Sequence, residues 1–100
     1  MNSVDEIRRL WDDWKTIPFP SGSAGKEVKG ICVTSIDTFA AGCIDTFVSS
    51  NGRLDQPRIE VLQRCRNELE IVVGTLDGNA RTYFNDLLVI CRRVLQSLGR

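Results

Sequence analysis

The chain has 100 residues, and its thirteen basic and thirteen acidic side chains cancel at neutral pH. This length predicts one domain with one hydrophobic core, and an apolar fraction of 42% argues against an intrinsically disordered chain. The balanced charge argues against a general nucleic-acid or anionic-membrane binder, because such proteins carry an excess of Lys and Arg.

The composition also argues against catalysis by the commonest side chains. The chain has no histidine, which removes the most frequent general base and metal ligand. We therefore expect a protein that is not an enzyme, with no catalytic residue, metal or cofactor. No apolar run approaches the roughly 18 residues that span a bilayer, and Asp5 and Glu6 interrupt any N-terminal signal segment. We expect a cytoplasmic protein that binds neither nucleic acid nor membrane.

A short helix is predicted over residues 1–17, ending before Pro18. Its apolar side chains recur at steps of three and four residues: Ile7, Leu10, Trp11 and Trp14. An isolated helix of this length is marginal in water, so it must pack against another surface. We favour packing of both indoles on the rest of the protein, and the alternative is that they form a surface for a partner.

Residues 18–25 are a Pro/Gly/Ser linker, and the longest predicted helix spans residues 24–50. An apolar stripe at helical spacing defines that helix: Val28, Cys32, Ile36, Phe39, Cys43 and Phe47. The tetrapeptide Ile-Asp-Thr-Phe occurs twice within it, at 36–39 and 44–47. Its two aspartates lie about 12 Å apart along the axis, which is too far for a carboxylate pair acting on one bond.

Turn signals separate this helix from two more, predicted over residues 56–75 and 78–98. Asn51 and Gly52 are residues that adopt the left-handed conformation closing a helix. Asp55 before Gln56-Pro57 indicates a helix start with the Asp55 side chain as its cap, and Asp77 is the corresponding cap residue for the last helix.

These elements predict an all-α fold, an antiparallel up-down bundle of three long helices plus the short N-terminal helix. The whole chain, 1–100, is one domain, with residues 26–98 as its three-helix core. The predicted core residues share the inner apolar stripes of the three long helices: Cys32, Ile36, Phe39, Cys43, Phe47, Leu62, Cys65, Leu69, Val72, Phe84, Leu87, Cys91 and Leu98.

The four cysteines all fall on apolar stripes, and none belongs to a Cys-x-x-Cys pair. Cys32 and Cys43 lie roughly 16 Å apart along one predicted helix, so they cannot share a zinc ion with ligands about 2.3 Å away. We expect four buried free thiols that behave as small apolar side chains. The alternative is a disulfide from Cys43 to Cys65 or Cys91, which requires an oxidising compartment.

The favoured functional hypothesis is a non-catalytic protein–protein interaction module, such as a small bacterial accessory or immunity-type protein. Its partner would be another protein or a second copy of itself in a homodimer. The hypothesis rests on the missing catalytic chemistry and on more apolar surface than the expected bundle covers.

The alternative is a domain that binds a small ligand or effector in a pocket between the N-terminal helix and the bundle. The candidate binding residues are Trp11, Trp14, Phe19 and Arg53. An enzyme that relies on carboxylates and arginine is the least favoured hypothesis, because the helical phases do not bring two acidic side chains together.

Overall fold

The computed structural model describes residues 3–100, and within that range it contains four α-helices and one short β-hairpin. The helices are α1 (Ser3–Trp14), α2 (Val33–Ser49), α3 (Gln56–Val73) and α4 (Gly78–Ser97). The hairpin joins β1 (Glu27–Val28) to β2 (Ile31–Cys32) immediately before α2. The predicted all-α bundle is therefore confirmed.

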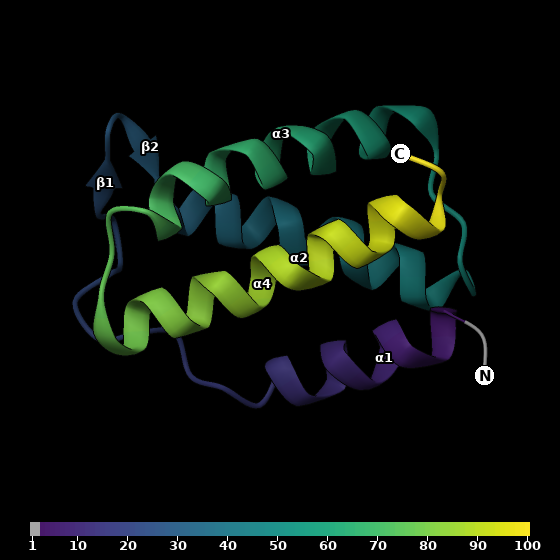
Figure 1. Cartoon of the computed structure of the whole chain (residues 1–100), viewed down its shortest axis with the longest axis horizontal. Coiled ribbons are helices and arrows are strands. Elements are labelled where there is room, and N and C mark those ends of the chain that lie inside the picture. The colour runs from purple at the N-terminus through teal and green to yellow at the C-terminus, as the bar shows by residue number, and fades with distance from the viewer. Residues whose placement is uncertain (1–2) are drawn as a thin grey trace.

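Successive helices run in opposite directions along the long axis of the molecule (Figure 1). The three long helices contact one another, and α1 packs on α4 and α2. In Figure 1, α1 and α3 lie on opposite sides of α4, so α1 completes the bundle as a fourth antiparallel member. No helix between residues 3 and 100 is long and apolar enough to cross a membrane.

The predicted start of the long helix at residue 24 is wrong, because residues 27–32 form the hairpin. Glu27 pairs with Cys32 and Val28 with Ile31, which leaves Lys29 and Gly30 as a two-residue loop. Both loop residues have positive φ, 51° and 81°, as a type I′ hairpin turn requires. The β-branched neighbours favour strands, and Val28 is buried against the bundle.

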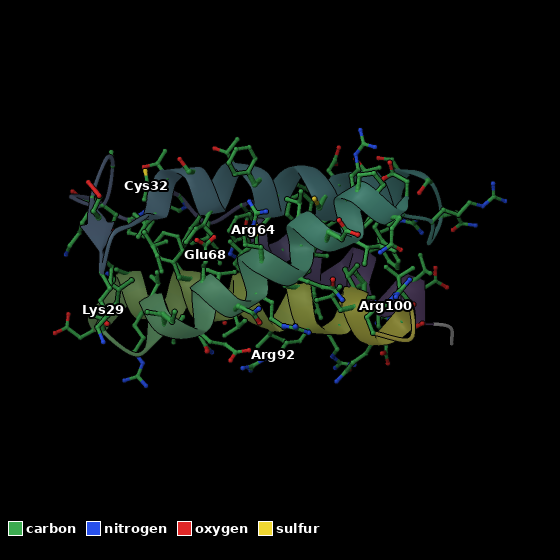
Figure 2. The ribbon with its side chains drawn as sticks, turned by 90° about the horizontal axis from the view of Figure 1, so that it is seen from above. Lys29, Cys32, Arg64, Glu68, Arg92 and Arg100 are labelled. Carbon is green, nitrogen blue, oxygen red and sulfur yellow. The ribbon has the colours of Figure 1, made fainter. Side chains whose placement is uncertain are left out.

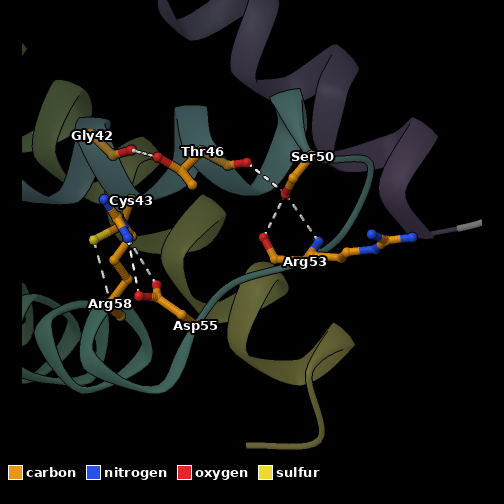
Figure 3. A network of polar contacts seen from close by, with 7 residues as sticks. All are labelled: Gly42, Cys43, Thr46, Ser50, Arg53, Asp55 and Arg58. Carbon is orange, nitrogen blue, oxygen red and sulfur yellow. Dashed lines mark hydrogen bonds and ion pairs between the residues drawn. The ribbon is translucent and has the colours of Figure 1, made fainter.

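The turn between α2 and α3 has the predicted backbone but a different use of its side chains (Figure 3). Asn51 and Gly52 have φ of 60° and 101°, and the Gly52 N–H donates to the Phe47 carbonyl at 2.8 Å. Asp55 is the N-cap residue of α3, but its carboxylate accepts the Arg58 guanidinium at 3.0 and 3.1 Å. Asp77 likewise precedes α4 without a side-chain cap.

Most of the predicted core is confirmed. Ten of the predicted residues are buried: Ile36, Cys43, Phe47, Leu62, Cys65, Leu69, Val72, Phe84, Leu87 and Cys91. Three predictions are wrong. Cys32 and Leu98 are only half-buried, because each lies at an end of its helix. Phe39 is 59% exposed, because it lies beside the stripe that enters the core.

Candidate functional site

An aromatic cluster attaches α1 and the linker to α4. Trp14 stacks on Trp11 with ring centroids 5.5 Å apart and lies 4.8 Å from the ring of Tyr83. Phe19, from the linker, meets the rings of Tyr83 and Phe84 edge-on at 5.7 and 5.9 Å. The structure thus brings three of the candidate binding residues, Trp11, Trp14 and Phe19, into one cluster.

The two indoles of this cluster lie in the core. Trp11 is 4% exposed and Trp14 is 6% exposed, so both rings pack on the bundle. The Trp14 Nε1–H donates to the backbone carbonyl of Tyr83 at 3.1 Å. That bond fixes the end of α1 against α4.

Phe19 borders an open cleft between the linker and the start of α4. The cleft has a volume of about 510 Å³. Its lining is mostly apolar with a polar edge: Ile17, Pro18, Phe19, Pro20, Ser21, Asn79, Thr82, Tyr83 and Asp86. The predicted pocket therefore has a counterpart, but the linker rather than the face of α1 forms its wall.

Arg53 lies apart from the other candidate residues. It belongs to the α2–α3 turn, at the end of the bundle opposite the linker (Figure 1). Its backbone is held by Ser50, whose hydroxyl lies 2.6 Å from the Arg53 carbonyl oxygen. The side chain is exposed and extends away from α2 and α3 (Figure 3), so the structure does not bring Arg53 to the aromatic cluster.

A second hollow lies between the hairpin, α2 and α3, beside the exposed ring of Phe39. Its volume is about 220 Å³, and Ile31, Ile36 and Val61 supply apolar walls. Arg64 and Glu68 stand at its edge on the α2 side of α3, with Cys32 at the hairpin end (Figure 2). We call this surface the Phe39 face, and it combines an apolar projection, an apolar hollow and two opposite charges.

The thiols of this region differ in the direction of their pKa shifts. Hydrogen bonds from the Ser35 hydroxyl, and then from the Ser35 and Thr34 N–H groups, lower the pKa of Cys32. Cys65 lines the same hollow from beneath, and burial raises its pKa to about 12. Burial also raises the pKa of Cys43. The half-exposed Cys32 is therefore the more nucleophilic thiol.

The sequence prediction missed the Phe39 face because it placed Phe39 on the main core stripe of this helix. The buried residues of α2 include Ile36, Ala40, Ile44 and Phe47. At 100° per residue, a stripe centred on these residues leaves Phe39 about 90° to one side. The spacing of Ala40, Ile44 and Val48 is the sequence signal for this phase.

Within residues 3–100, no group of three or more Cys, Asp and Glu side chains is arranged to hold a metal ion. The chain matches no protein-family model, no curated protein and no solved structure.

Proposed function

We propose that the chain is a non-catalytic protein-interaction module that binds through the Phe39 face. The observation that carries the proposal is the 59% exposure of Phe39 beside an apolar hollow. An aromatic side chain is a common anchor at the centre of protein interfaces, where its burial contributes much of the binding free energy. We propose that such a module serves as a small bacterial accessory or immunity-type protein in the cytoplasm.

A second copy of the chain is the partner that this face fits best. A two-fold interface requires one patch that complements itself. The Phe39 face offers a ring that projects and a hollow that can receive the same ring from the partner copy. Arg64 and Glu68 are four residues apart on α3, so an antiparallel pairing of two α3 helices would set each charge opposite its counterion.

Light scattering after size exclusion, at several concentrations in reducing buffer, tests the proposal. The wild-type mass should approach twice the chain mass as concentration rises, and Phe39→Ala should remain monomeric at every concentration. Val89→Ala is the matched control, because Val89 is also exposed, at 37%, but lies on α4. A wild-type monomer throughout, or equal effects of the two substitutions, would contradict the homodimer.

A charge exchange tests the orientation of the two copies. Arg64→Glu alone and Glu68→Arg alone should each weaken the homodimer, because like charges then face each other. An equimolar mixture of the two variants should recover association, since each charge again meets its opposite. No recovery in the mixture would contradict the antiparallel arrangement.

A small-ligand domain is the second candidate function, and the linker cleft supports it. The cleft combines apolar walls with the half-buried carboxylate of Asp86, a combination suited to a ligand with an apolar body and a cationic group. Benzylamine and benzoate are a matched pair of probes for amide chemical shifts. Benzylamine should shift the Thr82, Tyr83 and Asp86 amides more than benzoate does, and equal or absent shifts would contradict this function.

A further inference from the structure

Arginine side chains surround a polar groove on the other side of α3 from the Phe39 face. The groove has a volume of about 320 Å³ and lies between α3 and α4. Its lining has Leu95 as the apolar member, with polar and charged side chains around it: Arg66, Asn67, Glu70, Arg92, Gln96 and Arg100. Figure 2 shows Arg92 and Arg100 along the α4 side of α3, away from Arg64 and Glu68.

The side chains of this groove carry a surplus of positive charge, although the chain as a whole is neutral. Three guanidinium groups face one carboxylate, so the lining side chains sum to a charge of +2. The carboxylate of Glu70 is 3.5 Å from Arg92 in an exposed ion pair. Arg66 and Arg100 instead donate to neutral amide oxygens, those of Asn67 at 3.3 Å and Gln56 at 3.1 Å.

The backbone holds Arg100 in place at one end of the groove. Leu98 is the C-cap residue of α4, and Gly99 adopts a φ of 77°. The Gly99 N–H donates to the Gln96 carbonyl at 3.0 Å, and the Arg100 N–H donates to the Leu95 carbonyl at 2.8 Å. This pair of bonds is a Schellman motif. It turns Arg100 back over the end of α4, so its side chain joins Arg66 and Arg92 around one groove.

We propose that this groove binds a small molecule that carries a phosphate ester or diphosphate. Each guanidinium has five N–H donors in a planar fork that matches phosphate oxygens, and most of those donors have no protein acceptor among the bonds described above. The surplus charge favours a dianionic group over a neutral one. A bounded groove on a chain of zero net charge favours a small ligand over a long polyanion.

Titrations with inorganic phosphate and pyrophosphate at constant ionic strength test this inference, with calorimetry and amide chemical shifts as readouts. Pyrophosphate should bind with a Kd of about 1 mM, a modest affinity because the groove is open to solvent. Arg66→Gln and Arg100→Gln should each weaken binding about tenfold, through loss of charge-assisted hydrogen bonds. Arg81→Gln is the matched control on α4, outside the groove, and should change nothing.

Glu70→Gln should raise the affinity for pyrophosphate, whereas the arginine substitutions lower it. This substitution removes the only carboxylate side chain lining the groove and frees Arg92, so affinity should rise about threefold. A gain of affinity cannot result from partial unfolding. Absence of saturation by about 10 mM pyrophosphate, or equal losses in Arg66→Gln and Arg81→Gln, would overturn the proposal.

Two further measurements distinguish a small phosphate ligand from a nucleic acid, and the groove from the homodimer surface. A short single-stranded oligonucleotide at the same ionic strength should bind no more tightly than pyrophosphate, and much tighter binding would overturn the small-ligand assignment. The monomeric Phe39→Ala variant should keep its affinity for pyrophosphate, because the groove lies on the other side of α3. Phosphate binding in the groove and homodimer formation through the Phe39 face can therefore be confirmed or contradicted independently.

Discussion

Single side chains differ in role even where they are neighbours and equally buried. Trp11 and Trp14 stack on each other inside the core. Only Trp14 has an acceptor for its ring N–H, the Tyr83 carbonyl. The Trp11 Nε1 is buried without a hydrogen-bond partner among the described residues. An unpaired buried donor costs free energy, so the two indoles contribute unequally to stability.

Trp14→Phe should therefore destabilise the protein more than Trp11→Phe, by about 1 kcal/mol. The first substitution removes a hydrogen bond along with ring area, whereas the second also removes an unsatisfied donor. Urea unfolding followed by far-UV circular dichroism at about 222 nm measures both, because the helical backbone dominates that signal. Equal losses, or a larger loss for Trp11→Phe, would contradict the different roles.

Cys32 should react first among the four thiols. It is half-exposed with a lowered pKa, whereas Cys43, Cys65 and Cys91 are buried with raised pKa values. A limiting amount of iodoacetamide on the native protein, followed by peptide mass spectrometry, should place most of the label on Cys32. Ser35→Ala should slow that reaction near neutral pH by removing the hydroxyl that stabilises the thiolate. Even labelling of all four cysteines would contradict this order.

In the turn between α2 and α3, both the backbone conformation and the packing of a neighbouring helix favour glycine at position 52. Gly52 has a φ of 101°, and a Cβ at this position would lie 2.8 Å from the Val4 side chain of α1. The turn between α2 and α3 therefore also receives the start of α1. Gly42 has neither constraint, since it lies within α2 with open space around its Cα.

Substitution of these two glycines by alanine should have opposite effects. Gly52→Ala should lower the free energy of unfolding by about 2 kcal/mol, through backbone strain and contact with Val4. Gly42→Ala should raise it by up to about 1 kcal/mol, because alanine favours a helix interior. Chemical denaturation of both variants measures the pair. A stabilising Gly52→Ala would contradict the close approach of α1.

A hydrogen bond between α4 and α2 makes the stability of the whole molecule depend on pH. The Tyr83 hydroxyl of α4 donates to the Asp37 carboxylate of α2 at 2.8 Å. Partial burial raises the pKa of Asp37, and the hydrogen bond from Tyr83 opposes that shift without cancelling it. The folded state therefore binds more protons than the unfolded state between the two pKa values. This group's contribution to stability is largest at low pH and is lost as pH rises through the folded pKa.

Asp37→Asn should make the protein more stable than wild type at neutral pH, because asparagine accepts the same hydrogen bond without a buried charge. The difference should disappear near pH 3, below the unfolded pKa of an aspartate at about 3.9. Asp45→Asn is the matched control, since Asp45 occupies the same place in the repeated tetrapeptide but is exposed. Urea unfolding between pH 3 and pH 7 measures both. A neutral-pH loss of stability in Asp37→Asn would contradict this account.

Local signals in the sequence were sufficient for the helices and for most of the core. The starts of α3 and α4 follow Asp55 and Asp77, and Asn51 and Gly52 end α2, because these residues act through their own backbone preferences. The hairpin was missed although its signal is local. Val28 and Ile31 fit helical spacing as well as strand pairing, and only the positive φ of Lys29 and Gly30 decides between them.

The sequence by itself determined that four helices form and which of their residues are apolar, because apolar side chains recur every three to four positions. Only the tertiary structure decided which of the two phenylalanines in the repeated tetrapeptide is covered. Phe47 is fully buried and Phe39 is 59% exposed, although both end the tetrapeptide Ile-Asp-Thr-Phe. Eight residues turn a helix by about 80°, and the positions of α3 and α4 then set what each side chain meets. The arginine groove arises in the same way, from two helices and a terminal turn that meet only in the folded protein.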